Sequence, residues 1–249
     1  MRILCTNDDG YLALGLQVLA EAARSLGEVT IVAPDREQSA TSHSLTLHYP
    51  LRAKRASDGA LVVDGTPTDC VILAVGDLLG KRPDVCLSGI NHGPNMGEDV
   101  LYSGTVAAAM EATVLGIPSI AISYAGEEFE GLAAWEPIVR ELLGSVLGQE
   151  SFPADTLLSV NLPPVAPETV RGVRVTSLGR RRYSDSLTRA RDPSGREYLW
   201  IGGGVTDWQG PPDSDFRAVQ EGFVSVTPLH LDLTNYQLLE EIRGWQLTL

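Results

Sequence analysis

The chain has 249 residues, of which 43% are hydrophobic, a proportion that is ordinary for a globular protein. This length favours one α/β core with an additional C-terminal part over several separate domains. Lys and Arg total 19 and Asp and Glu total 32, so the formal net charge is −13, which argues against a nucleic-acid or anionic-membrane surface. We therefore expect no nucleic acid and no membrane as partners. A phosphate-bearing ligand would have to be attracted locally, by a divalent cation or a helix N-terminus.

The beginning of the chain and its apolar stretches indicate a cytoplasmic protein. No charged and then apolar leader precedes the first predicted strand, over residues 2–6. The longest uncharged apolar stretch, residues 112–126, contains a glycine and a proline and is shorter than the ~20 residues that a membrane helix needs. Three cysteines lie in apolar segments, as expected of buried thiols in a reducing compartment: Cys5, Cys70 and Cys86.

Two adjacent carboxylates, Asp8 and Asp9, stand where the first predicted strand ends in a turn. Such a pair repels itself when both groups are ionised, so it faces water, shares a proton or faces a cation. In open α/β sheets, ligands bind outside the carboxyl ends of strands, which favours the cation. The alternative is that Asn7, Asp8 and Gly10 only form the turn and cap a helix.

The hydrophobic periodicity predicts alternating helices and strands along most of the chain. A helix over residues 14–26 and a strand over residues 28–33 complete a β-α-β unit, which implies a parallel sheet. The turn after the first strand lacks the G-x-G-x-x-G pattern, which disfavours NAD or FAD. The later predicted elements are a hairpin over 46–64, a helix capped by Thr66, strands over 83–88, 119–124 and 156–162, helices over 106–115 and 133–147, strand-like pieces over 170–178, 197–202 and 222–231, and a helix over 236–243.

These elements predict an α/β fold with a mostly parallel sheet and an extended C-terminal arm or hairpin region. Residues 1–164 would form the catalytic core. Residues 165–249 would supply further strands, an oligomerisation arm and a terminal helix packed on the same core. A simple extension of the sheet is the alternative role for this C-terminal part.

Polar side chains follow three predicted strands, and a parallel sheet brings such strand ends to one edge. They are Asp8 and Asp9 after the first strand, Ser39 and His43 after the second, and Asn91 and Asn95 after the third. The carboxylate, hydroxyl and amide oxygens among them suit Mg²⁺, Mn²⁺ or Ca²⁺ better than a thiolate-binding metal. An ion with few protein ligands leaves room for a substrate oxygen and a water molecule.

The tripeptide Ser103-Gly104-Thr105 opens the predicted helix over residues 106–115. Two hydroxyls around a bare glycine at a helix N-terminus can hold a phosphate, although an ordinary helix cap explains the same residues. A metal site beside such a cradle is the equipment for hydrolysing a phosphomonoester, because both neutralise the charge of the phosphoryl group.

Four segments in this order resemble the survival protein SurE family: TNDDG, VAPDREQSATSHSLT, GTPTDC and SGINHGPNMGEDVLYSGTVAAAME. The resemblance is close over about the first 125 residues and continues more loosely in GRRRYSDSLTRARDP and YLWIGGG. Ser42 stands where many members of the family carry glycine, and Tyr11-Leu12-Ala13 varies a turn. Neither departure changes the type of a candidate ligand.

The resemblance implies a Rossmann-like three-layer fold. It also implies release of phosphate from nucleoside 5′- and 3′-monophosphates by a homodimer or homotetramer built through a swapped C-terminal arm. It also implies one divalent cation per subunit, Mg²⁺ or Mn²⁺. The residues that match the metal ligands of the family are Asp8, Asp9, Ser39 and Asn91. Those that match its phosphate contacts are Asn95, Ser103, Gly104 and Thr105.

Two mechanisms and three functions remain open at this stage. In the expected mechanism, a water molecule at the metal attacks phosphorus with Asp8 as its base, and His43 or a hydroxyl assists the leaving oxygen. The alternatives make Asp8 a covalent nucleophile and His43 a loop residue that only forms hydrogen bonds. A non-catalytic nucleotide or phosphate sensor is the second function, and a sugar-nucleotide transferase, for which no acceptor site is visible, is the third.

Overall fold

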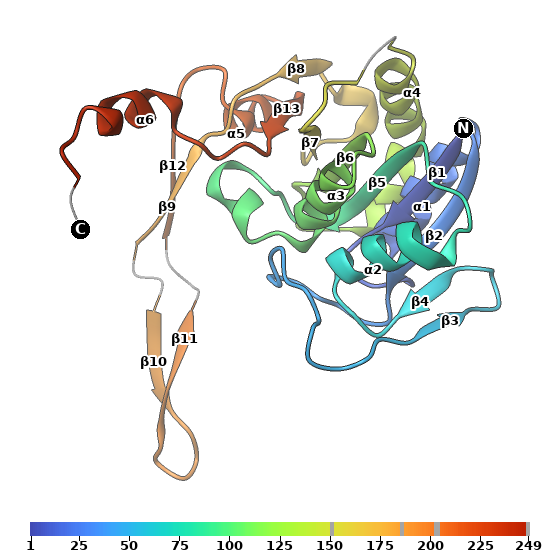
Figure 1. Ribbon diagram of the computed structural model, residues 1–249, viewed down its shortest axis with the longest axis horizontal. Coiled ribbons are helices and arrows are strands. Elements are labelled where there is room, and N and C mark those ends of the chain that lie inside the picture. The colour runs from blue at the N-terminus through green and yellow to red at the C-terminus, as the bar shows by residue number, and fades with distance from the viewer. Residues whose placement is uncertain (150–151, 185–186, 202–204, 248–249) are drawn as a thin grey trace.

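The computed structural model describes residues 1–149, 152–184, 187–201 and 205–247. Its centre is a nine-stranded sheet in the order β3-β4-β2-β1-β5-β6-β7-β13-β8, covered by helices on both faces (Figure 1). The strands of this sheet are β1 (Arg2–Thr6), β2 (Glu28–Pro34), β3 (Ala53–Arg55), β4 (Leu61–Val63), β5 (Val85–His92), β6 (Ser119–Tyr124), β7 (Thr156–Leu162), β8 (Val173–Val175) and β13 (Val224–His230).

Most neighbouring strands of the sheet are parallel. The run β4-β2-β1-β5-β6-β7 is parallel throughout, whereas β3 is antiparallel to β4 and β13 is antiparallel to β7. The predicted three-layer α/β fold with a mostly parallel sheet is therefore confirmed. Its parallel register brings the carboxyl ends of β1, β2 and β5 to one edge.

The helices are α1 (Leu14–Arg24), α2 (Pro67–Leu73), α3 (Gly104–Val114), α4 (Glu136–Leu147), α5 (Asp215–Gln220) and α6 (Tyr236–Arg243), with shorter helical turns η1 (Ala74–Leu78), η2 (Gly97–Leu101), η3 (Glu130–Trp135) and η4 (Pro167–Thr169). Successive side chains of a strand point to opposite faces of the sheet, so the side chains of β1 pack alternately in two hydrophobic cores. Ile3 and Cys5 pack in the core beneath α1 and α4, and Leu4 packs in the core beneath α2 and α3.

Local sequence accounts for the start of α2. Thr66 caps this helix by accepting a hydrogen bond from the N–H of Asp69, and the Asp69 carboxylate accepts one from the N–H of Thr66 in return, at 2.9 Å. Pro67 occupies the first helical position, where its missing N–H costs nothing. The predicted cap is confirmed, and the three cysteines are buried free thiols, as expected.

The C-terminal part joins the core and also extends away from it. Strands β8 and β13 complete the central sheet, whereas β9 (Arg180–Ser184) pairs with β12 (Val205–Gln209) and β10 (Leu187–Arg191) pairs with β11 (Glu197–Ile201). Together the last two pairs form a long arm (Figure 1). The arm residues 185–186 and 202–204 lie outside the described part of the chain.

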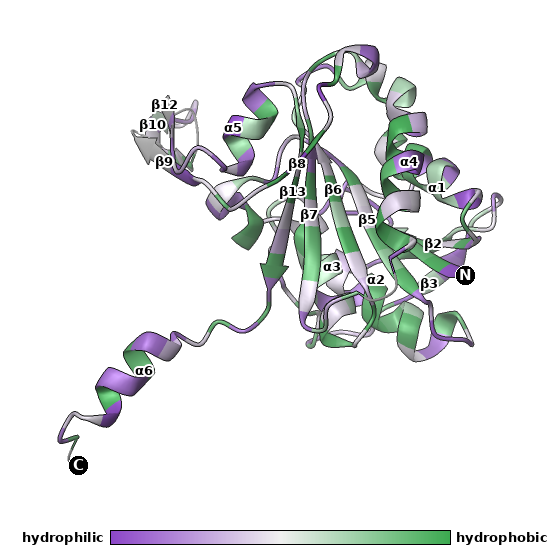
Figure 2. Cartoon of the chain, turned by 90° about the horizontal axis from the view of Figure 1, so that it is seen from above, coloured by the Kyte–Doolittle hydropathy of each residue, from purple (hydrophilic) through white to green (hydrophobic). Residues whose placement is uncertain are grey.

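The terminal helix differs from the expectation that it packs on the core. Helix α6 has the predicted bounds, but none of its residues is buried, and it stands clear of the sheet (Figure 2). Leu238 and Trp245 are exposed. The sequence pattern predicts an apolar stripe on a helix, but it does not specify the surface that covers the stripe.

Among the described residues, no helix has both the length and the hydropathy that crossing a membrane requires.

A buried carboxylate connects α5 with two distant loops. Asp215 accepts hydrogen bonds from the backbone N–H groups of Gly97 at 2.8 Å, Gly179 at 2.9 Å and Phe216 at 2.8 Å. Burial raises the pKa of Asp215, and the three N–H donors act in the opposite direction by stabilising the carboxylate. Asp215 therefore holds Gly179, at the base of the arm just before β9, next to Gly97 in the loop after β5.

We expect Asp215→Ala to lower the free energy of unfolding by about 3 kcal/mol, because it leaves buried N–H donors without an acceptor. Urea unfolding at neutral pH measures the change. The matched control is Asp213→Ala, which removes an exposed carboxylate two residues earlier and should change stability by less than about 0.5 kcal/mol. Equal effects of the two substitutions would contradict this role.

Candidate functional site

Asp8 lies at the centre of the carboxyl edge of the sheet. It follows β1, is only 3% exposed, and accepts a hydrogen bond from the hydroxyl of Thr105 in the first turn of α3. Burial raises the pKa of Asp8 to about 6, which the hydrogen bond from Thr105 opposes and the neighbouring charge of Asp9 reinforces. The N-terminus of α3 also places its positive dipole end beside this carboxylate.

Gly104 allows the close approach of α3 to Asp8. A Cβ atom at position 104 would lie 2.8 Å from Cβ and 2.9 Å from Oδ2 of Asp8, and 3.2 Å from the Thr41 hydroxyl oxygen. Both distances to Asp8 are shorter than real Cβ contacts. The bare glycine in Ser103-Gly104-Thr105 is therefore required by the packing around Asp8.

Asp9 and Asn91 also contact the segments at this edge of the sheet. Asp9 Oδ2 accepts a hydrogen bond from the backbone N–H of His92 at 3.2 Å, and burial raises the Asp9 pKa. Asn91 Nδ2 donates to the carbonyl of Gly93 at 2.8 Å, which leaves Asn91 Oδ1 3.3 Å from the Thr105 hydroxyl. Thr105 thus contacts the oxygens of both Asp8 and Asn91, residues that are 83 positions apart in the sequence.

The loop after β2 brings Ser39 to the same edge. The backbone N–H of Gln38 donates to the carbonyl of Asp8 at 2.7 Å, so the residue next to Ser39 contacts the first strand end directly. Ser39 itself is exposed, and its hydroxyl donates to Glu37 at 2.7 Å. The oxygen of that hydroxyl retains lone pairs that can accept or ligate.

Ser42 adopts a backbone conformation that is uncommon for a residue other than glycine. Its φ angle is +54°, a left-handed conformation that glycine adopts most easily. The Ser42 hydroxyl donates to the carbonyl of Leu101 at 2.7 Å, and its N–H donates to the carbonyl of Tyr102 at 3.1 Å. These two bonds hold the strained residue and fix its loop to the segment before α3.

His43 has a partner that the sequence did not indicate. Its Nε2 lies 2.8 Å from Oε2 of Glu111 on α3, and the Glu111 side chain is 12% exposed. The two residues are 68 positions apart, so no local pattern relates them. The pair holds the imidazole against α3, the helix that begins with the cradle residues.

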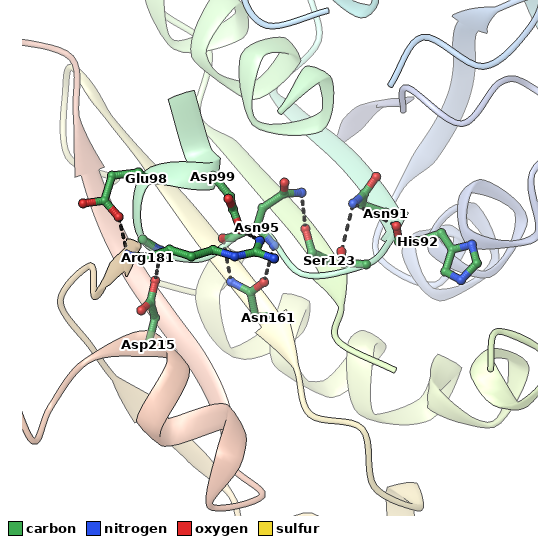
Figure 3. A network of polar contacts seen from close by, with 11 residues as sticks. Asn91, His92, Asn95, Glu98, Asp99, Ser123, Asn161, Arg181 and Asp215 are labelled. Atoms are coloured by element: carbon green, nitrogen blue, oxygen red, sulfur yellow. Dashed lines mark hydrogen bonds and ion pairs between the residues drawn. The ribbon is translucent and has the colours of Figure 1, made fainter. Parts of the chain in front are cut away.

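Asn95 is tied into an amide network, whereas Ser103 caps α3. The Asn95 side chain donates to the Ser123 hydroxyl at 2.8 Å, and Asn161 exchanges two hydrogen bonds with the Asn95 backbone (Figure 3). Ser123 is the penultimate residue of β6 and Asn161 is the penultimate residue of β7, and neither was predicted from the sequence. The Ser103 oxygen accepts from the N–H of Val106 at 3.1 Å, so its hydroxyl hydrogen remains able to donate.

The structure therefore brings most of the predicted site residues to one edge of the sheet. Asp8, Asn91 and Thr105 are in direct contact, and Gly104 packs on Asp8. No group of three or more His, Cys, Asp or Glu residues that could hold a metal occurs in the described part of the chain. A cation here would depend on carboxylate, amide and hydroxyl oxygens together, which are the ligands that hard cations prefer.

An unsatisfied polar atom beside Asp8 supports this donor set. Asn7 is fully buried, and its side-chain oxygen has no hydrogen-bond partner among the described residues. Buried polar atoms are nearly always satisfied by protein, water or an ion. The arrangement can thus hold a hydrated cation at the two aspartates and an anion at the start of α3.

Comparisons with known proteins give one consistent result along the whole chain. A family model described as survival protein SurE matches residues 3–185. A protein named 5′-nucleotidase SurE from Gemmatimonas aurantiaca is 62% identical over 98% of each chain, and one from Geotalea uraniireducens is 49% identical over 100% of each. The crystal structure of a SurE protein from Aquifex aeolicus covers 98% of both chains with a TM-score of 0.86 and 43% identity.

Gly104→Ala should weaken Mn²⁺ binding to the metal-free protein by at least about tenfold, because the added Cβ displaces Asp8. Calorimetric titration measures the affinity. Gly144→Ala is the matched control, since Gly144 lies in α4 and its Cβ would meet only Leu26 Cδ2, at 3.8 Å. That control should keep its Mn²⁺ affinity and gain about 0.5 to 1 kcal/mol in stability. An unchanged affinity of the Gly104 variant would refute the packing argument.

Proposed function

Because this chain belongs to the survival protein SurE family, we propose that it is a metal-dependent phosphomonoesterase that hydrolyses nucleoside 5′-monophosphates, and also 3′-monophosphates, to nucleoside and phosphate. The observation that supports this most directly is the contact of Thr105 with both Asp8 and Asn91. It joins the predicted cation ligands to the predicted phosphate cradle at one point. The relatives named 5′-nucleotidase support the substrate class.

We propose that Asp8, Asp9, Ser39 and Asn91 hold one divalent cation per subunit, Mg²⁺ or Mn²⁺. When bound, such an ion polarises the phosphoryl group and lowers the pKa of a water molecule. The fit rests on the oxygen donors, on the raised pKa values of Asp8 and Asp9, and on the unsatisfied Asn7 oxygen. Positive charge next to two desolvated carboxylates lowers the cost of their ionisation.

The protein residues around the cation have separate tasks in this proposal. Ser103, Gly104 and Thr105, with Asn95, orient the phosphoryl oxygens through hydroxyl, amide and backbone N–H donors. Asp8, buried at the end of β1, accepts a proton from the attacking water. His43, held by Glu111, donates a proton to the leaving oxygen of the nucleoside.

The C-terminal part has a role in assembly in this proposal. We propose that residues 165–249 join copies of the chain into a homodimer or homotetramer through the arm. The support is the set of large apolar side chains that the arm exposes, among them Leu199, Trp200 and Ile201, and the exposed Tyr236 and Leu238 of α6. Exposed apolar groups in such numbers are typical of protein contact surfaces.

The decisive experiment measures orthophosphate release from a panel of nucleoside 5′- and 3′-monophosphates, with metal-stripped protein before and after addition of Mg²⁺ or Mn²⁺. We expect activity only with metal, and a loss of at least about 100-fold in Asp9→Asn. The matched control is Asp77→Asn, an exposed aspartate in η1, which should remain fully active. Retained nucleotide binding without release by the unaltered chain would instead indicate a sensor.

The role of His43 is tested by comparing two leaving groups. His43→Gln should lower kcat for a nucleoside monophosphate about 100-fold, whereas p-nitrophenyl phosphate, whose leaving group needs no proton, should lose little. The control is His48→Gln, an exposed histidine in the same loop. Equal losses on both substrates would show that His43 has only a structural role.

A further inference from the structure

The short turn η2 links the loop after β5 to the proposed phosphate cradle, Ser103-Gly104-Thr105. The carbonyl of Asp99 in η2 accepts hydrogen bonds from the backbone N–H groups of Tyr102 at 3.0 Å and Ser103 at 3.1 Å. Ser103 then caps α3 and begins the cradle. A displacement of Asp99 is therefore transmitted through one hydrogen bond to Ser103.

The same turn contacts the base of the arm through Arg181 in β9. The backbone N–H of Arg181 donates to Glu98 Oε2 at 2.5 Å, and its guanidinium forms an ion pair with the Asp99 carboxylate (Figure 3). The side chains of this ion pair are 23% and 13% exposed. Partial burial makes such a pair stronger and less screened than a surface pair.

The two backbones also meet directly beside the ion pair. Gly97, which begins η2, has a φ angle of +55°, and a Cβ there would lie 2.9 Å from the carbonyl oxygen of Gly179. The Asp215 carboxylate accepts the N–H of both glycines, at 2.8 and 2.9 Å. η2 and the start of β9 are thus held as one packed unit.

The guanidinium of Arg181 is held by the second strand of the arm as well. Its central carbon lies 5.1 Å from the ring centre of Trp208 in β12, and Trp208 stacks on Phe216 at 5.3 Å. An arginine stacked on an aromatic ring and paired with a carboxylate has little rotational freedom. The geometry of the arm base therefore determines where the guanidinium meets Asp99.

We propose that Arg181 and Asp99 are positioning residues, through which the base of the arm sets the position of the phosphate cradle. The affinity of the site for the phosphoryl group then depends on a contact between two residues that are 82 positions apart in the sequence. This inference rests on the proposed function, because it assigns the cradle to the substrate phosphate. Its ligand is an orthophosphate or a phosphomonoester.

The test uses the full-length chain with Arg181→Gln. We expect KM for a nucleoside monophosphate and the inhibition constant of orthophosphate to rise together, by about tenfold. The Mn²⁺ affinity should stay unchanged, because the described contacts of Arg181 do not include Asp8, Asp9 or Asn91. A purely structural role would lower thermal stability without moving the two phosphate-dependent constants.

A double-mutant cycle isolates the ion pair. Asp99→Asn should raise the same two constants by a similar factor, and the double variant should show little further change, because both substitutions remove the Arg181–Asp99 ion pair. Arg181→Lys keeps the charge and should recover part of the loss. Arg196→Gln is the control, since Arg196 forms an exposed ion pair with Asp192 in the arm hairpin, at 2.8 Å, and should leave both constants unchanged.

Several results would overturn the inference. They are unchanged phosphate constants in Arg181→Gln, additive losses in the double variant, or a loss seen only in protein that light scattering shows to be dissociated. If Arg181→Gln does not fold, the nearly isosteric Asp99→Asn decides by the same constants. If the unaltered chain releases no phosphate, the proposed function fails, and calorimetric binding of orthophosphate to the Mn²⁺-loaded variants still decides the positioning role.

Discussion

The site depends on one buried carboxylate packed against the first turn of a helix. Asp8 is taken out of water at the end of β1, and burial of an uncompensated charge is costly. The Thr105 hydroxyl, the Thr105 backbone and the dipole of α3 together compensate that cost. This compensation is possible only because the helix lacks a side chain at Gly104, so that its first turn reaches the carboxylate.

The same constraint orders the surrounding loops. The loop after β2 reaches Asp8 through the N–H of Gln38, and Ser42 fixes that loop to the segment before α3. On the far side, Asn95, Ser123 and Asn161 satisfy one another at the ends of β6 and β7. Asn95, Ser123 and Asn161 therefore form a buried, mutually bonded polar network at the ends of these strands, and such networks are rigid.

Most of the fold and the convergence of the site could be predicted from the sequence, because they follow from local patterns. The predicted bounds of β6, β7 and α6 match the structure, and a parallel sheet alone was sufficient to bring Asp8 and Asn91 together. The partners of the site residues could not be predicted. Glu111 looks like any polar residue on a helix, and its contact with His43 depends on how a distant loop folds back.

Helix α5 and the position of α6 were missed for related reasons. Helix α5 has only six residues, too few for a clear periodicity, so the role of Asp215 could not be seen. Helix α6 has the predicted periodicity, yet its apolar stripe specifies no particular surface, and it stands clear of the core in the single chain. Local pattern determines which elements form, whereas the contacts between distant elements determine which residues they hold in place.

The net charge of −13 places a final condition on the proposed function. A strongly acidic chain attracts cations and repels an anionic nucleotide at long range, so substrate attraction must arise at short range. The desolvated pair Asp8 and Asp9 favours cation binding, since a cation lowers the energy of both ionised carboxylates. In the proposed function, Asp8 and Asp9 would hold a cation beside the cradle, and the N–H groups at the start of α3 would supply the remaining positive potential that the phosphate needs.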